Sequence, residues 1–109
     1  MPASALLISA RTWTPSFAVP WASRLLEMWG QGSFKTLADS ILYHFGEHGE
    51  EVGAENILQY LRKAEGFAQN LKRAERVFNA DGSVRYIKNG RYIVKSVEGL
   101  ILSFGKETI

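Results

Sequence analysis

The sequence of 109 residues contains no cysteine. This absence excludes disulfide bonds, thiolate catalysis, and zinc or iron–sulfur sites built on cysteine. Long apolar runs are also missing, because none approaches the roughly eighteen residues that a membrane-spanning helix needs. The first ten residues lack the positively charged start of a secretory signal. We therefore expect no membrane span, in a chain that is either mature as it stands or a remnant of a longer one.

The residues that are present have the composition of a globular protein, with 46% hydrophobic and 22% charged, which excludes a disordered or collagen-like chain. The length suits a single domain with a real core. We expect one domain over residues 1–109, in which residues 1–32 form a less regular segment rich in aromatic residues and prolines. Within it, Arg24 to Trp29 are predicted to form a short helix. The tryptophans of this segment are expected to pack against the main domain, and they are Trp13, Trp21 and Trp29.

Charge is unevenly distributed along the sequence. Residues 1–61 contain three Lys or Arg against six Asp or Glu, a net charge of −3. Residues 62–109 contain ten against five, a net charge of +5. This asymmetry predicts either an anionic partner for the second half, most often a nucleic acid, or simply a solvated basic face.

Residues 33–49 carry the strongest helical pattern in the sequence. Their apolar residues recur at steps of three and four, which is typical of a helix that buries one stripe. The predicted stripe consists of Phe34, Leu37, Ala38, Ile41, Leu42 and Phe45. Ser33 is placed to cap the start of this helix, and Gly49 to end it in the left-handed conformation. A second helix is predicted over about residues 55–71, with a glycine inside it that costs roughly 1 kcal/mol relative to alanine.

The only two histidines, His44 and His48, lie four residues apart near the end of the first helix. Their Cβ atoms should be about 5–6 Å apart. His48 points close to the direction of Ile41, so we expect it along the rim of the apolar stripe. With an unperturbed pKa near 6.5, imidazole can donate or accept a proton at neutral pH. The pair is therefore the best functional indication in the sequence, although a histidine at an apolar edge is often only a core residue.

After the second helix the pattern changes to runs rich in Val, Ile and Tyr. The predicted strands cover residues 76–79, 84–88, 91–97 and 100–104. Asn89-Gly90 predicts a two-residue hairpin turn of type I′, which needs positive φ at both positions. Asp81-Gly82 and Glu98-Gly99 predict two further hairpins. The sequence thus predicts an α+β fold with N-terminal helices packed on a C-terminal antiparallel β-meander of three to four strands.

The turns also predict which side chains share a face of the sheet. Two-residue loops place Lys95 opposite Leu102 and Val94 opposite Ser103. The face toward the helices would carry Val84, Tyr86, Ile93, Val97, Leu100, Leu102 and Phe104. The other face would carry Arg85, Ile87, Tyr92, Val94, Ser96, Ile101 and Ser103.

A resemblance to a known family covers about residues 37–106. It is carried by Leu42-Tyr43-His44-Phe45-Gly46-Glu47-His48-Gly49-Glu50-Glu51-Val52-Gly53, then Tyr60-Leu61-Arg62-Lys63-Ala64 and Phe67, and finally Ser103-Phe104 in the last strand. This pattern resembles C-terminal toxin domains of bacterial contact-dependent inhibition and related polymorphic toxin systems. Such domains are similar to the barnase, EndoU, colicin D and RelE group of metal-independent ribonucleases. Val52 replaces the usual aromatic residue, and Ser103 stands where threonine is common.

The resemblance implies an endoribonuclease toxin that cuts RNA, with transfer RNA among the candidates, by attack of a 2′-OH on the scissile phosphate and without a cofactor. Its catalytic residues would be His44, His48, Arg85, Tyr92 and Ser103. Flanking phosphates would be bound by Lys72, Arg73, Arg76, Lys88 and Arg91. The implied setting is the bacterial cytoplasm, reached as a monomer from a secreted or surface-displayed parent protein, with an acidic immunity protein as inhibitor.

Two other functions also fit the sequence. The segment 44–48 matches H-x-x-E-H, the inverted zinc-protease motif, for which Glu98 or Glu107 would have to supply a third ligand. Alternatively, the domain is a non-catalytic module that binds RNA or a protein partner, and its histidines are structural. Its basic sheet would then grip the RNA or an acidic partner. Independently of the function, the basic cluster at residues 72–76 also suits the dipole at the end of the second helix, which is its structural explanation.

Overall fold

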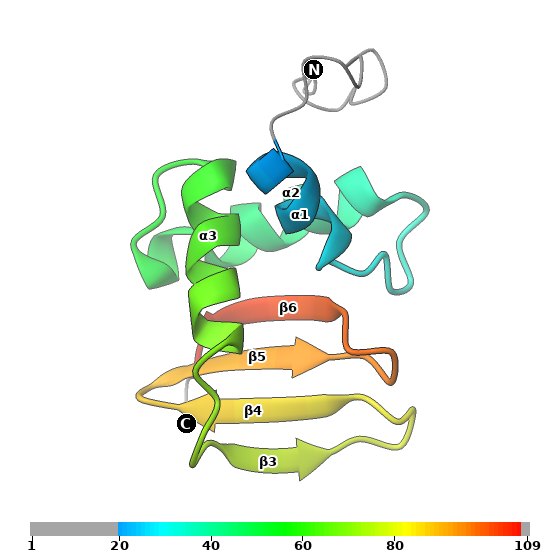
Figure 1. Cartoon of the computed structure of the whole chain (residues 1–109), viewed down its shortest axis with the longest axis vertical. Helices are drawn as coiled ribbons and strands as arrows, with labels where there is room; N and C mark the ends of the chain where they lie inside the picture. Colours follow the sequence, from blue (N-terminus) through cyan, green and yellow to red (C-terminus); the bar gives the residue numbers. More distant parts are fainter. Residues whose placement is uncertain (1–19, 108–109) are drawn as a thin grey trace.

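The computed structural model describes residues 20–107 and has helices followed by a four-stranded antiparallel sheet (Figure 1). The helices are α1 (Pro20–Glu27), α2 (Leu37–His48), the short 3-10 helix η2 (Glu50–Val52) and α3 (Ile57–Ala68). The strands are β3 (Glu75–Phe78), β4 (Val84–Lys88), β5 (Arg91–Lys95) and β6 (Ile101–Lys106), in this order across the sheet. The predicted α+β class, with helices packed on a C-terminal β-meander, is confirmed.

Both ends of α2 differ from the prediction. The cap is Thr36 rather than Ser33, because Thr36 Oγ1 accepts a hydrogen bond from Asp39 N at 3.0 Å. Gly49 has a right-handed φ of −57°, and the chain turns left-handed only at Gly53, where φ is 76°. The absence of a side chain at position 49 is still required, since an added Cβ would lie 2.7–2.8 Å from atoms of the residue four positions earlier.

The apolar stripe of α2 is narrower than predicted. Ile41 is buried in the core, and Leu37 and Phe45 pack against it. Leu42, in contrast, is 41% exposed. Phe34 lies before the first residue of the helix and so does not belong to its stripe.

α3 is shorter at both ends than the predicted range of 55–71. Asn56 Oδ1 accepts a hydrogen bond from Gln59 N at 2.9 Å and so caps the helix. Gly66 lies inside it, as predicted, on the exposed side. The buried face of α3 consists of Tyr60, Leu61 and Ala64.

The segment expected to be less regular contains α1 and a core tryptophan. α1 begins and ends earlier than the predicted helix, and Trp29 follows it in a parallel β-bridge with Ile101. Trp29 is 2% exposed, and its Nε1–H donates to Ser40 Oγ at 3.1 Å. Packing of a tryptophan against the domain is therefore confirmed at this position, whereas Trp13 and the side chain of Trp21 lie outside the described residues.

The turns of the first two hairpins agree with the prediction. Asn89 and Gly90 have φ values of 52° and 78°, the signature of a type I′ turn. Lys88 accordingly lies opposite Arg91. The β3–β4 hairpin turns at Gly82, where φ is 90°.

The β5–β6 hairpin contains a β-bulge that the predicted register lacks. Val94 lies opposite Ser103 as predicted, but Lys95 lies opposite Ile101 instead of Leu102. Because two residues of β6 oppose one residue of β5 there, the side chains before the bulge exchange faces. Ile101 therefore faces the helices and is 1% exposed, and the prediction that Leu102 does so is wrong.

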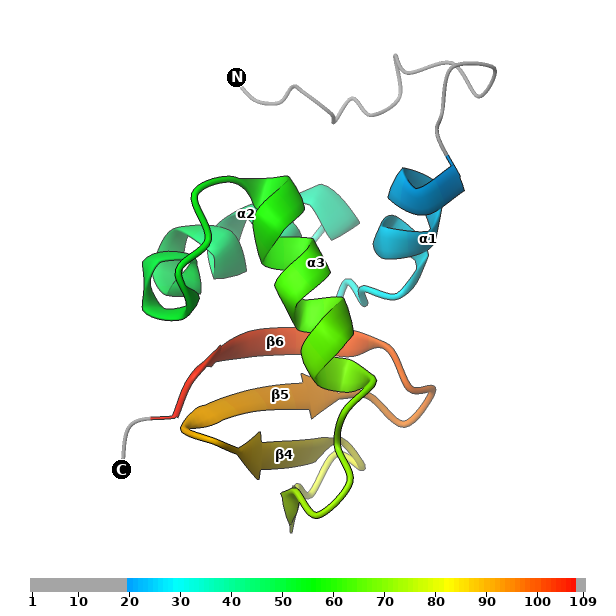
Figure 2. The same cartoon turned by 60° about the vertical axis from the view of Figure 1, so that its left-hand side comes forward.

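The helices occupy one face and one edge of the sheet. Both views show α3 crossing in front of the sheet, while α1 and α2 lie beyond its β6 edge (Figures 1 and 2). Tyr60 of α3 packs on Phe104 of β6 and donates its hydroxyl hydrogen to the backbone oxygen of Phe104. Alternation along the strands places Arg85, Tyr92 and Ser103 on the face away from α3. With at most twelve residues each, the helices between residues 20 and 107 are too short to cross a bilayer.

Candidate functional site

His48, the last residue of α2, is held between a carboxylate and a phenol. Its Nδ1 lies 2.9 Å from Glu51 Oε1, and its Nε2 lies 3.2 Å from Tyr92 Oη. Tyr92 Oη lies in turn 2.8 Å from Ser103 Oγ. We refer to these four residues, Glu51, His48, Tyr92 and Ser103, as the His48 network. It joins η2 and α2 to the neighbouring strands β5 and β6.

A glycine on β6 allows α2 to approach the sheet closely enough to form this network. A Cβ added to Gly105 would lie 2.8 Å from His48 Nδ1 and 3.0 Å from Glu51 Oε1. The same Oε1 accepts a hydrogen bond from Lys106 N at 3.1 Å. This backbone hydrogen bond, and to a lesser extent the one with His48, lowers the pKa of Glu51 below its ordinary value of 4.5, so its carboxylate is ionised at neutral pH.

An ionised Glu51 sets the direction of the hydrogen bonds. The carboxylate can only accept, so His48 Nδ1 donates to it. In the neutral imidazole, Nε2 then accepts from the hydroxyl of Tyr92, which accepts from the hydroxyl of Ser103. When Nε2 is protonated, it donates to Tyr92, and Tyr92 donates to Ser103. The network can therefore pass a proton between the imidazole and the surface of the sheet.

Arg85 covers the phenol of the network. Its Cζ lies 3.8 Å from the centroid of the Tyr92 ring, and its Nη2 lies 2.6 Å from Glu107 Oε1. Tyr92 is 6% exposed, and burial is the main reason that its pKa is raised, so the phenol stays neutral and able to donate. The side chain of Arg85 is 33% exposed. Because a guanidinium has five N–H donors, pairing with one carboxylate leaves it able to bind a further anion.

His44 lies beside the network but has different surroundings. Its Nδ1 lies 2.8 Å from the backbone oxygen of Ser40, which can only accept, so Nδ1 carries the hydrogen and Nε2 carries the lone pair. Burial lowers the pKa of His44 below its ordinary value of 6.5 and outweighs the opposite effect of the hydrogen bond to Ser40. The rings of His44 and His48 are stacked, with centroids 6.1 Å apart. The two histidines are thus neighbours, as predicted.

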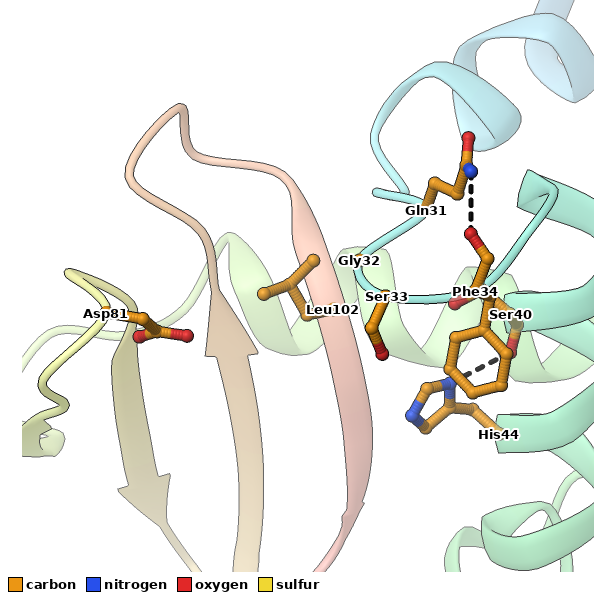
Figure 3. Close-up of a pocket in the computed structure, with 8 residues that line it drawn as sticks. All are labelled: Gln31, Gly32, Ser33, Phe34, Ser40, His44, Asp81 and Leu102. Carbon is orange, nitrogen blue, oxygen red and sulfur yellow. Dashed lines mark hydrogen bonds between the residues drawn. The ribbon is translucent and has the colours of Figure 1, made fainter.

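A pocket of about 440 Å³ opens beside His44 (Figure 3). It is lined by Gln31, Gly32, Ser33, Phe34, Ser40, His44, Asp81 and Leu102. These residues come from the loop between α1 and α2, from α2, from the β3–β4 turn and from β6. Apart from His44, none of them is a site candidate from the sequence, since only the folded chain brings these segments together.

Two of the five predicted phosphate-binding residues lie on the face of the sheet that α3 covers. Lys88 Nζ donates to the backbone oxygen of Asn70 at 2.8 Å, just after α3. Arg76 lies over the ring of Tyr86, with 5.5 Å between Cζ and the ring centroid. Residue alternation puts both side chains on the opposite face from Tyr92.

The other three predicted phosphate-binding residues also lie away from the His48 network. Arg91 pairs with a residue of the α3-covered face and directs its Nη2 toward Val52 O, 3.5 Å away. Lys72 and Arg73 are exposed in the turn that follows α3. Of the cationic residues proposed from the sequence, Arg85 is the one that the structure places at the network.

Sequence reasoning missed three residues of the site. Glu51 follows His48 by three residues, a spacing at which helical side chains meet, so this signal was present in the sequence. Gly105 and Glu107 meet the network only through the position of β6 beside α2, for which no local pattern exists.

The described residues do not provide the donors of a metal site. No group of three His, Asp or Glu between residues 20 and 107 lies close enough together to hold a metal ion. Glu107, one of the two third ligands that the H-x-x-E-H alternative requires, instead pairs with Arg85. The geometry of the described donors therefore does not support the zinc alternative.

Comparison with models of protein families and with curated proteins finds no match for this chain. The basis for assigning a function is therefore the geometry of the site itself.

Proposed function

We propose that the protein is an endoribonuclease that cleaves RNA by attack of a ribose 2′-OH on the adjacent phosphate, without a metal ion. The observation that carries this proposal is the His48 network, with the guanidinium of Arg85 over its phenol. The reaction needs a base for the 2′-OH, an acid for the leaving oxygen, and donors for the charge on the phosphate between them. All three kinds of group occur together at this site.

The two histidines supply the base and the acid. His44 is suited to be the base, since its lowered pKa keeps it unprotonated and its Nε2 carries the lone pair. It takes the proton of the 2′-OH as the bond from O2′ to phosphorus forms. His48 then gives the proton of Nε2 to the 5′ oxygen as the bond from phosphorus to O5′ breaks. The products are a 2′,3′-cyclic phosphate and a 5′-hydroxyl.

The remaining groups hold the ring of His48 in position and stabilise the negative charge on the phosphate in the transition state. Glu51 accepts from Nδ1 of His48 in either protonation state, so it holds the ring with Nε2 toward the sheet. When the 5′ oxygen takes the place of Tyr92 as the acceptor of the Nε2 proton, the hydroxyls of Tyr92 and Ser103 turn to donate hydrogen bonds to the non-bridging phosphate oxygens. Arg85 neutralises the negative charge that these oxygens carry in the transition state.

The same proposal includes the partners and the setting. The chain acts as a monomer in the bacterial cytoplasm after delivery from a secreted or surface-displayed parent protein. An acidic immunity protein covers its site in the producing cell. The support for this is the resemblance of residues 42–53 to polymorphic toxins and the net charge of +5 on residues 62–109.

The test is cleavage of total RNA by the purified protein in excess chelator, followed by mapping of the cut ends. We expect cyclic-phosphate and 5′-hydroxyl ends, and a loss of at least about 100-fold in rate for His48→Ala. Tyr92→Phe keeps the ring under Arg85 and removes only the hydroxyl, so it separates hydrogen bonding from packing. Glu98→Gln, in the exposed β5–β6 turn, is the control and should cleave normally. Full activity of His48→Ala, or activity that disappears with chelation, would contradict the mechanism.

A non-catalytic module that binds RNA is the second candidate. It is favoured by the ion pair of Arg85 with Glu107, because a carboxylate already occupies part of the guanidinium. The double variant His44→Ala, His48→Ala distinguishes the two functions. A binding module keeps its affinity for RNA in this variant and shows no cleavage in the parent protein, whereas an enzyme loses its cleavage activity.

A further inference from the structure

We infer that a basic surface at one end of the sheet binds the phosphates of the RNA strand that leads away from the cleaved bond. We refer to this surface as the basic rim, and it consists of Lys72, Arg73, Lys88, Arg91 and Lys106. The inference rests on the proposed function and gives the class of its substrate. That substrate is a strand long enough to pass from the His48 network around the end of the sheet.

The register of the strands places three cations of the rim in a row. Lys88 of β4 lies opposite Arg91 of β5, which in turn lies opposite Lys106 of β6. With neighbouring strands about 4.8 Å apart, the row is about 10 Å long. Side chains in directly opposite positions share a face of the sheet, and like charges there repel each other. A polyanion that lies across the row removes this repulsion.

The turn between α3 and β3 extends this row. Nζ of Lys88 donates to the backbone oxygen of Asn70 at 2.8 Å, which brings its ammonium group to the turn that contains Lys72 and Arg73. The two residues of the turn and Lys106 are exposed, and the other two rim residues are partly exposed. The end of β6, the β4–β5 turn and the connection from α3 to β3 lie at the same end of the sheet (Figure 1). The five cations therefore gather in one region.

Carboxylates of the protein do not neutralise the rim. Between residues 20 and 107, no rim cation forms an ion pair with a carboxylate, and the cations that do are Arg24, His48 and Arg85. Glu75, close to the turn in sequence, lies on the opposite face of the sheet from Lys88. Glu51 meets the backbone N–H of Lys106, but its Oε1 already accepts from that N–H and from His48. The positive charge of the rim is therefore left for an external anion.

The rim adjoins the His48 network around the end of the sheet. Tyr92 lies opposite Gly105, and the next pair along the same two strands is Arg91 with Lys106. Because successive side chains point to opposite faces, the two pairs lie one residue apart on opposite sides of the sheet. A strand whose scissile phosphate lies at Tyr92 reaches the rim by passing the β4–β5 turn. A single phosphate cannot contact both places, so the rim acts only on substrates with several phosphates.

The first experiment measures binding without cleavage. A single strand of about 20 nucleotides of 2′-O-methyl RNA, which lacks the attacking hydroxyl, is titrated into the intact protein at about 50 to 200 mM salt, and Kd is obtained from fluorescence anisotropy. In the double variant Lys72→Gln, Lys106→Gln, the slope of log Kd against log salt should fall by about 1.4, since each phosphate contact on a single strand contributes about 0.7. Lys63→Gln, Lys95→Gln removes two lysines from the middle of α3 and the other end of β5, and should keep the parent's slope.

The second experiment compares the cleavage of a long and a short substrate. A dinucleoside monophosphate has one phosphate, so Lys72→Gln, Lys106→Gln should cleave it within about twofold of the parent rate. For unmodified RNA of the longer length, kcat/KM should fall at least about fivefold through a higher KM, because the lost contacts are made equally in the ground state and the transition state. The fall should be the same for strands of different sequence, since phosphate contacts carry no sequence information. Urea unfolding shows that each variant is folded, and the midpoint should not fall, because Lys106→Gln relieves a repulsion with Arg91.

The two experiments together separate this inference from the proposed function. A protein that binds the 2′-O-methyl strand with the expected change of slope, but cleaves no RNA, would support the rim and refute the ribonuclease. Cleavage by a protein whose salt slope and KM for the long strand are unchanged in Lys72→Gln, Lys106→Gln would refute the rim and leave the ribonuclease standing. That second outcome is also the one expected of a surface that binds an acidic protein instead of RNA. Neither binding nor cleavage would refute both.

Discussion

Replacing Gly105 with alanine is the sharpest test of the site, because it adds one methyl group under the imidazole of His48, the proposed acid. The new Cβ would lie 2.8 Å from His48 Nδ1 and 2.9 Å from His48 Cγ. Ordinary contact begins near 3.4 Å, so the ring must move by about 0.6 Å. A shift of that size along the bond to Tyr92 Oη lengthens 3.2 Å to about 3.8 Å, which is no longer a hydrogen bond.

We expect this variant to lose activity without losing its fold. A catalytic group displaced by a sizeable part of an ångström costs on the order of 10- to 100-fold in rate. The same glycine sits in a strand, where alanine is intrinsically better by about 0.5–1 kcal/mol. This gain offsets part of the strain of the contact, so the free energy of unfolding should change by less than about 1 kcal/mol.

The assay compares kcat/KM for RNA cleavage with urea unfolding of the same preparations. Gly46→Ala is the matched control, because position 46 lies in α2 between the two histidines and an added Cβ meets nothing within 4 Å. It should be about 1 kcal/mol more stable than the parent and equally active. A Gly105→Ala protein with the parent's activity would refute the placement of His48 in the reaction.

Three further predictions concern the core, the pH dependence and the hydroxyl on β6. Trp29→Phe removes the donor to the buried Ser40 hydroxyl and should lower the free energy of unfolding by about 1–3 kcal/mol, seen as a lower urea midpoint; an unchanged midpoint contradicts it. Burial lowers the pKa of His44 in the folded chain, so as the pH falls below 6.5 the unfolded chain takes up a proton before the folded chain does. The contribution of the neutral imidazole to the free energy of unfolding is therefore complete above pH 6.5 and is lost as the pH falls below it. Urea midpoints above and below that pH should show this slope in the parent and not in His44→Gln. Ser103→Ala should lose at least about tenfold in kcat/KM, whereas Ser103→Thr keeps the hydroxyl and the activity; full activity of the alanine variant would exclude the role of this residue.

The hairpins were predictable because their chemistry is local. Asn89-Gly90 specifies one turn type, and that turn fixes the pairing of β4 with β5. This correct register is the reason that Arg85 and Tyr92 were placed on the same face. The bulge in β6 has a different origin, since Ile101 pairs with Trp29 from a distant part of the sequence. No local pattern contains that pairing, and the predicted register was therefore wrong beyond Ser103.

The ends of α2 show a second limit of sequence reasoning. Ser33 and Thr36 are both good capping residues, and the sequence does not say which hydroxyl the folded loop will place over the first turn. Gly49 satisfied the rule for a left-handed helix end, but the structure needs glycine there because of its contact with Phe45. Glycine is required both where the backbone is left-handed and where a side chain would collide with a neighbour, and only the fold shows which requirement applies at position 49.

The candidate site likewise contains residues that could be predicted from the sequence and residues that depend on non-local contacts. The two histidines and the hydroxyls of Tyr92 and Ser103 could be proposed from periodicity, register and resemblance. The contact of Glu51 with His48 is local and could have been proposed from the spacing of three residues, whereas the contact of α2 with the β6 edge is non-local, so the role of Gly105 appears only in the structure. The number of charges in a segment does not show on which face of the sheet each basic side chain lies. The five predicted phosphate-binding residues accordingly lie away from the His48 network.

β6 shows how closely the core and the site are combined in this fold. Its successive residues have different tasks: Ile101 and Phe104 fill the core, Leu102 lines the pocket, Ser103 joins the His48 network, and Gly105 makes room for the imidazole. The bulge makes this order possible, because it allows core residues to be three apart where a regular strand would require them to be two or four apart. β3, by contrast, is exposed at every position. Substitutions of Ile101 and Phe104 should therefore mainly lower stability and those of Ser103 and Gly105 mainly lower activity, whereas those along β3 should leave the site unchanged.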